Sequence, residues 1–134
     1  MTNDKLSQSY LEKGKLRIET LEFLHGKEGY SDVVREAQEC VELLLKALLR
    51  VLGIEVPKIH DVGRTLKQNR AKFPPLIQKN LDEICEISRS LRKDRELSFY
   101  GSDDWIPTEE YSAEDSQIAI EKAKKIYDWV EKSL

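Results

Sequence analysis

Hydrophobic residues recur at helical spacing along most of the chain. Over roughly residues 4–25, apolar side chains fall near a 3.6-residue period with lysines and glutamates between them: Tyr10, Leu11, Ile18, Leu21 and Leu24. Glycine inside a helix costs about 1 kcal/mol relative to alanine, so Gly14 predicts a close approach between two helices. Gly26 and Gly29 predict the end of this helix and a turn.

A second helix, from about Ser31 to Leu52, is apolar around most of its circumference. Ser31 and Asp32 are suitable N-terminal caps, and Gly53 is a suitable C-terminal stop. A helix that is apolar on nearly all sides is surrounded by protein. A domain this small offers few helices to enclose it, so we expect part of its surface to be a subunit interface and the chain to form a homodimer.

Three further helices are predicted along the rest of the chain. A short one spans about residues 61–69, a third long one about residues 76–97 after Pro74-Pro75, and a last one begins at the capping box of Ser112 and Asp115. Val62, Leu66 and Phe73 are the apolar anchors around the short helix. Four long helices, one short helix and short connections predict an all-α, antiparallel up-and-down bundle, one domain over residues 1–134.

Composition narrows the class of protein. The chain has 134 residues, 40% of them hydrophobic and 35% charged, which is an ordinary globular balance. A net charge of −3 argues against a surface that coats nucleic acid, and residues 96–121 hold eight acidic residues and no basic one. The beginning of the chain is polar, and no apolar run is long enough to cross a membrane. Cys40 and Cys85 fall in helical apolar patterns typical of buried, reduced thiols, so we expect a cytoplasmic protein with no membrane attachment.

The sequence lacks the residues that a metal site or a glycine-rich phosphate-binding loop needs. His25 and His60 do not stand at metal-ligand spacing with each other or with the two cysteines. Neither of the two common glycine-rich phosphate-binding motifs is present. We therefore expect no metal and no cofactor.

Two weaker patterns are candidate binding sites. Gln38, Glu42 and Lys46 are spaced by four on the second helix and continued by Arg50, so they form a stripe that faces either solvent or a polar groove. Residues 89–101, RSLRKDRELSFYG, carry three arginines toward a predicted helix end, followed by Tyr100. Such arginines either complement the helix dipole or bind phosphate, and an aromatic face stacks on a base. The basic residues between the second and third long helices are typical of a solvated face: Lys58, Arg64, Lys67, Arg70 and Lys72.

The chain resembles the HEPN domain family (higher eukaryotes and prokaryotes nucleotide-binding). The resemblance rests on residues 30–66, YSDVVREAQECVELLLKALLRVLGIEVPKIHDVGRTL, with the Gln38-x3-Glu42-x3-Lys46 helix, the Gly53 break and the entry His60-Asp61-Val62. The segment RKDRELSFYG and the alanine-rich last helix extend it over nearly the whole chain.

The resemblance implies a helical bundle that dimerises and, in many members, a minimal nucleotidyltransferase partner in a toxin–antitoxin pair. It also implies that catalytic members are metal-independent RNases with an Arg-x4–6-His motif near the end of the third long helix. In that motif the histidine moves protons and the arginine holds the scissile phosphate.

This sequence departs from the catalytic motif. Arg92 and Arg95 match the motif arginine, but no histidine follows either one at an allowed spacing, where Ser98 and Tyr100 stand instead. Neither side chain titrates near neutral pH. His60 lies outside the motif, and we interpret it as capping or packing.

Three functions follow from these patterns. The first is a catalytically degenerate domain that binds a nucleotide or RNA phosphate in a dimer cleft, through Arg92, Arg95 and Tyr100 and the stripe of Gln38, Glu42 and Lys46, beside a nucleotidyltransferase partner. The second is an RNase that uses Arg92, Arg95 and Tyr100 with a base other than histidine. The third is a dimeric interaction module without a small ligand.

Overall fold

Helices make up the secondary structure of the described residues, apart from one isolated β-bridge between Ser102 and Trp105. The computed structural model describes the backbone of residues 2–58 and 62–134 and the side chains of residues 5–58, 62–93 and 100–134. Four long helices carry the fold: α1 (Thr2–Gly26), α2 (Tyr30–Val51), α4 (Pro75–Phe99) and α6 (Ala113–Ser133). The shorter elements are α3 (Val62–Gln68), the 3-10 turn η1 (Arg70–Lys72) and α5 (Pro107–Glu110). The prediction of an all-α chain is therefore confirmed.

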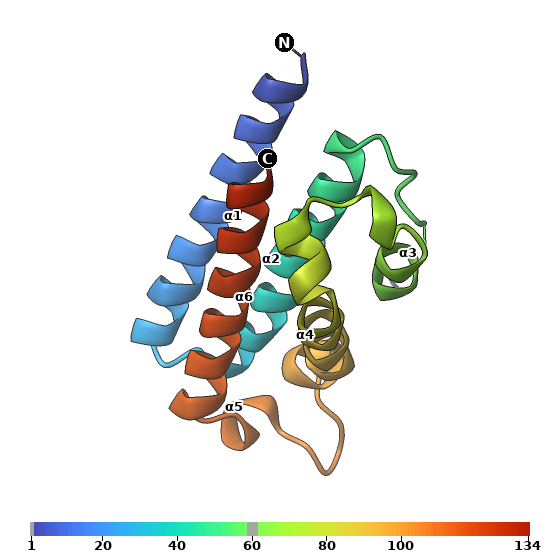
Figure 1. The fold of residues 1–134 in the computed structure, drawn as a ribbon. Helices are drawn as coiled ribbons and strands as arrows, with labels where there is room; N and C mark the ends of the chain where they lie inside the picture. The colour runs from blue at the N-terminus through green and yellow to red at the C-terminus, as the bar shows by residue number, and fades with distance from the viewer. Residues whose placement is uncertain (1, 59–61) are drawn as a thin grey trace.

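Helix α2 is the centre of the molecule. It packs against α1, α4 and α6 and also contacts α3 and α5, and Figure 1 shows it behind α4 and α6. Its apolar side chains are almost completely buried within one chain; Val33, Leu44 and Leu48 have no exposed surface. The argument that a second subunit must cover α2 was therefore wrong, because the other helices of the same chain surround it. The homodimer stays a prediction without this support.

The ends of α2 differ in how well the sequence predicted them. The cap at the N-terminus is Gly29, with no side-chain hydrogen bond, so the prediction that Ser31 and Asp32 cap the helix was wrong. Both residues lie inside the first turn. At the C-terminus Gly53 has φ +75°, its N–H donates to the carbonyl of Arg50 at 3.1 Å, and the N–H of Ile54 donates to that of Leu49 at 2.9 Å. This is the Schellman arrangement, and it confirms the predicted stop.

Helices α1 and α6 lie side by side on one side of α2 (Figure 1). The α6 N-terminus has the predicted capping box, in which Ser112 and Asp115 bond each other's backbone N–H groups. One turn further on, the buried Ser116 hydroxyl shares a hydrogen bond of 2.8 Å with His25 Nδ1 at the end of α1. This contact ties the end of α1 to the start of α6, so His25 has a structural role.

One expectation about a helix end needs correction. Between α4 and α6, residues 101–106 are not helical and are followed by the short helix α5, with Pro107 in its first turn. Helix α4 continues to Phe99, so its last turn contains no basic residue. Arg89 and Arg92 therefore do not stand at the helix end to complement its dipole. Among the helices described, none is long and apolar enough to span a bilayer.

Candidate functional site

An open cleft lies between α3 and α4. Its volume is about 490 Å³, within the range of small-molecule sites in proteins. Helix α3 and helix α4 each contribute one face to it: Gly63, Arg64, Lys67 and Gln68 from α3, and Asp82, Cys85, Glu86, Ser88, Arg89 and Arg92 from α4.

The spacing of residues on the two helices explains why these side chains meet. On α4 the lining residues recur every three or four positions from Asp82 to Arg92, so they share one face. On α3 the apolar anchors Val62 and Leu66 are buried, which leaves Arg64 and Lys67 on the outer side. The helices touch where the Cys85 thiol lies 3.7 Å from the Gly63 carbonyl oxygen.

Four cations and two carboxylates line the cleft. The cations are Arg64, Lys67, Arg89 and Arg92, and the carboxylates are Asp82 and Glu86. At neutral pH the lining therefore carries a net charge of about +2, in a chain whose net charge is −3. Arginine guanidinium groups donate parallel hydrogen bonds to phosphate oxygens, so this lining suits a phosphate-bearing anion.

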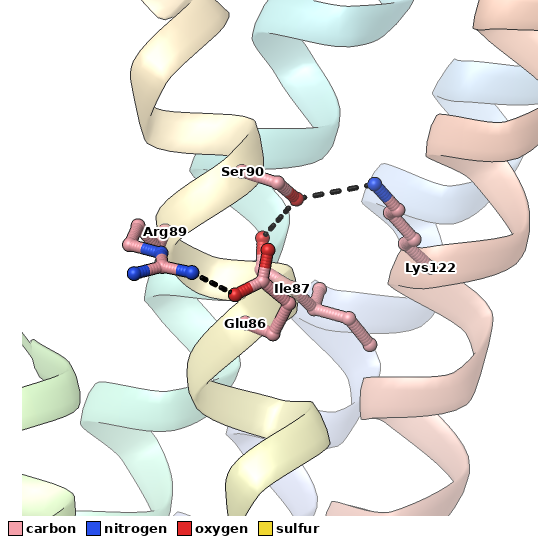
Figure 2. Close-up of polar contacts among 5 residues, drawn as sticks. All are labelled: Glu86, Ile87, Arg89, Ser90 and Lys122. Atoms are coloured by element: carbon pink, nitrogen blue, oxygen red, sulfur yellow. Dashed lines mark hydrogen bonds and ion pairs between the residues drawn. The ribbon is translucent and has the colours of Figure 1, made fainter.

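Glu86 already pairs with Arg89 one turn away (Figure 2). Both side chains are largely exposed, at 59% and 70%, so water screens this pair and it stabilises the fold little. The pair breaks easily, and Arg89 can then bond a ligand instead. The other side of α4 is fixed to α6, because Lys122 donates to Ser90 Oγ at 3.1 Å (Figure 2) and Lys125 pairs with Glu83 at 2.9 Å.

The polar stripe on α2 forms a bonded group of its own. Glu42 accepts hydrogen bonds from Gln38 Nε2 at 2.8 Å and from Lys46 Nζ at 2.7 Å. Exposure rises along the stripe, from 4% at Gln38 to an exposed Arg50, so the stripe passes from the interior to the surface. The amide oxygen Oε1 of Gln38 is buried and accepts no hydrogen bond from the described part of the chain. None of these residues lines the α3–α4 cleft.

The structure thus separates the six residues predicted to bind ligand. Arg92 lines the cleft, and Gln38, Glu42 and Lys46 lie together on α2. Tyr100 is 75% exposed immediately after α4, so most of its ring faces solvent. The Arg95 side chain and His60 lie outside the described residues. A role in ligand binding stays a prediction for all six residues.

Sequence reasoning missed Arg64 and Lys67. They belong to the basic connection that we interpreted as a solvated face, and the structure places both on the wall of the cleft. The signal that was available is their spacing of three beside the apolar anchor Leu66, which puts both cations on one side of a short amphipathic helix. Among the described residues, no three histidine, cysteine or acidic side chains gather as a metal site would require.

Three comparisons with known proteins bear on the fold and family. The family model described as "HEPN domain" matches residues 7–133. Among solved structures, the chain is similar to the crystal structure of TT1696 from Thermus thermophilus, with a TM-score of 0.77 and 22% identity. That alignment covers 96% of this chain and 98% of TT1696. No curated protein sequence matches the chain.

Proposed function

Because the chain belongs to the HEPN domain family, we propose that it binds a nucleotide or an RNA phosphate in the α3–α4 cleft without cleaving RNA. The observation that carries this proposal is the gathering of Arg64, Lys67, Arg89 and Arg92 on one open cleft. Cationic side chains gathered on one surface create a positive potential there, which raises the local concentration of anions. Tyr100, exposed at the end of α4, offers a base-stacking surface.

Binding without cleavage follows from the residues after the arginines. The positions at motif spacing from Arg92 and Arg95 contain no histidine, and Ser98 and Tyr100 stand there. Cleavage of RNA needs a group that takes and returns a proton near neutral pH, and neither a hydroxyl nor a phenol does so at its ordinary pKa. The arginines are therefore assigned to holding the anion.

The proposed assembly is an antiparallel bundle that pairs with a second copy of itself and works beside a nucleotidyltransferase. Support for both partners comes from the family resemblance. The acidic segment 96–121 is compatible with a basic protein surface and opposes extended contact with RNA. The identity of the neighbouring gene tests the nucleotidyltransferase directly.

Nucleotide binding is tested by thermal unfolding and calorimetry with ATP, GTP, CTP, UTP and a short RNA. A ligand at 100 times its Kd adds about 2.7 kcal/mol to the free energy of unfolding, which moves the melting temperature by several degrees. Arg92→Gln and Arg64→Gln are expected to weaken binding at least tenfold. Lys13→Gln is the matched control, since it removes one positive charge from an exposed position on α1, which is not part of the cleft.

The same experiments also test the other two candidate functions, the interaction module and the RNase. If no nucleotide and no RNA shifts the melting temperature, the proposal is wrong and the result favours the interaction module. RNA cleavage without metal by the purified protein, lost in Arg95→Ala, identifies an RNase and overturns the assignment to binding alone. If Lys13→Gln weakens binding as much as Arg92→Gln does, the ligand responds to overall charge and the cleft is not its site.

A further inference from the structure

A second groove lies between α4 and α6. It consists of two adjoining pockets, one of about 320 Å³ and one of about 140 Å³. Ile118 and Lys122 of α6 line both pockets, so they stand at the boundary between them. Lys122 reaches across to α4, where its Nζ donates to Ser90 Oγ at 3.1 Å (Figure 2). The groove therefore presents two depressions on either side of one lysine side chain.

The floor of the groove is apolar. It is formed by buried side chains of α2, α4 and α6: Val34, Ile87, Leu91 and Ala119. Ile118 belongs to the same surface but is 43% exposed, so a large aliphatic side chain faces water in the middle of the groove. Exposed apolar surface of this kind, bordered by polar residues, is typical of a protein interaction site.

The charged side chains around the groove are mainly acidic. The lining contains four carboxylates and two cations: Glu83, Glu86, Asp115 and Glu121, with Lys122 and Lys125. At neutral pH this lining carries a net charge of about −2. Arg89, which lies outside the groove, pairs with Glu86 and offsets one of the carboxylates in part. The rim stays negative after this pair is included.

The acidic character continues past one end of the groove. Tyr111, which follows α5 directly, lines the smaller pocket. The exposed carboxylates Glu109, Glu110 and Glu114 stand next to it in the sequence, and residues 101–121 contain no basic residue. A ligand in the groove therefore meets negative charge along the rim and beyond the smaller pocket.

We propose that this groove binds a basic amphipathic helix of a partner protein, with one apolar side chain in each pocket and its lysines or arginines against the acidic rim. A helix that docks in a groove presents apolar side chains one or two turns apart on one face, which fits two pockets on either side of Lys122. The stretch of α4 from Glu83 to Leu91 is about 12 Å long, so it accommodates about two turns of such a helix. This inference does not depend on the α3–α4 cleft, which takes a ligand of the opposite charge.

The charge of the rim separates this occupant from two others. Two copies of the groove facing each other across a twofold axis bring like charges together, so a second copy of the chain is disfavoured. The phosphates of an RNA meet the same repulsion. A basic amphipathic helix gains twice, because its apolar side chains remove Ile118 and the floor from water and its cations meet the carboxylates.

The test uses a labelled helical peptide of about fourteen residues, with leucines on one face and lysines on the other, and measures its Kd by fluorescence anisotropy. A peptide of the same composition in scrambled order keeps the charge and lacks the apolar face. We expect the amphipathic peptide to bind at least about tenfold more tightly than the scrambled one. Ile118→Gln should weaken its binding about tenfold. Leu16→Gln is the matched control, since Leu16 is 61% exposed on α1, outside the groove, and the change should leave the Kd unaltered.

The contribution of the rim is measured with Glu121→Gln. We expect this substitution to weaken binding of the amphipathic peptide about threefold and to reduce the dependence of the Kd on salt. Glu12→Gln makes the same charge change at an exposed position of α1 and should have no effect on either quantity. The melting temperature of each variant checks that it is folded.

Four results overturn the proposal. The first is absence of binding by the amphipathic peptide, and the second is an equal Kd for the two peptides, which reports charge attraction alone. The third is a control that weakens binding as much as its partner in the groove does, or a groove variant with an unchanged Kd. The fourth is a wild-type dimer that dissociates in Ile118→Gln, detected by sedimentation velocity, which assigns the groove to a second copy of the chain.

Discussion

Gly14 of α1 lies directly against the side chain of Leu44 of α2. A Cβ atom built on Gly14 would stand 2.6 Å from Leu44 Cδ2, closer than side chains approach one another in folded proteins. Leu44 has no exposed surface and is held by the surrounding core. The absence of a side chain at Gly14 is therefore what allows α1 to pack closely on the central helix, as the sequence predicted.

Replacement of Gly14 by alanine is expected to destabilise the protein by up to about 2 kcal/mol. Alanine favours the helix by about 1 kcal/mol, but crowding in a packed core costs about 1–3 kcal/mol, and the Leu44 side chain that must give way is fully buried. Urea denaturation measures the difference. Gly26→Ala is the control, because a Cβ there meets no atom within 4 Å, and it should be neutral or slightly stabilising. A Gly14→Ala variant about 1 kcal/mol more stable than the wild type, which is the gain that helix propensity alone predicts, would contradict the close-packing role of the glycine.

Truncation of Glu42 is expected to cost more than truncation of its partner Lys46. In Glu42→Ala the buried Gln38 amide loses the acceptor of its Nε2 hydrogen bond. The Oε1 of the same amide already accepts no hydrogen bond from the described residues. The substitution should therefore lower the free energy of unfolding by about 2–3 kcal/mol. Lys46→Ala should cost less than about 1 kcal/mol, because its side chain is 32% exposed and the Glu42 carboxylate keeps the bond from Gln38.

The same reasoning gives a rescue experiment. Gln38→Met removes the buried amide, so in the Glu42→Ala background it should recover part of the lost stability. Unfolding in urea of the two single variants and the double variant measures this coupling. If Glu42→Ala and Lys46→Ala cost the same, the group on α2 is an ordinary surface ion pair and its burial has no energetic consequence.

The periodicity of apolar residues predicted the helices well, because each long helix buries a continuous stripe. Helix ends were less predictable. Gly53 was predictable since a positive φ favours glycine. The start of α2 was not, because Ser31 is a good cap by type but lies buried inside the first turn. The enclosure of α2 also depends on how the other helices pack, which no local pattern specifies.

The candidate site was predictable only in part. Arg92 was singled out from its place in a run of arginines, whereas Arg64 and Lys67 looked like an ordinary charged surface. Helix α3 packs on α4 at the contact between Gly63 and Cys85, and this packing places Arg64 and Lys67 on the same cleft as Arg92. That contact joins segments more than twenty residues apart, and sequence spacing does not report it.

The folded chain should not depend on a second copy. Its core is complete within one protomer, with α2 covered by α1, α4 and α6. We expect the melting temperature to be the same from micromolar to tens of micromolar protein, even where size measurements detect a dimer. A melting temperature that rises with concentration would mean that association and folding are coupled. In that case the dimer contributes stability that the single chain lacks.

The Cys40 thiol makes the stability of the protein fall as pH rises in the alkaline range. Burial raises its pKa from 9.0 to about 12; the nearby Arg17 lowers the pKa by a smaller amount, and Glu36 raises it by less still. Below pH 9 the thiol is protonated in both the folded and the unfolded chain, so its effect on stability is constant. Between pH 9 and pH 12 only the unfolded chain ionises, which favours unfolding, and stability falls as pH rises.

The variant Cys40→Ala tests this directly, because it removes the titrating group. Between pH 8 and pH 10 the wild type should lose about 1 kcal/mol more stability than Cys40→Ala, measured by urea denaturation at each pH. Cys40→Ser, which keeps the size of the side chain and does not ionise in this range, should follow Cys40→Ala. Tyr127, whose pKa burial also raises, titrates in the same direction in all three proteins and so cancels in the comparison. Parallel pH curves for the wild type and both variants would show that Cys40 ionises as readily in the folded chain as in the unfolded one.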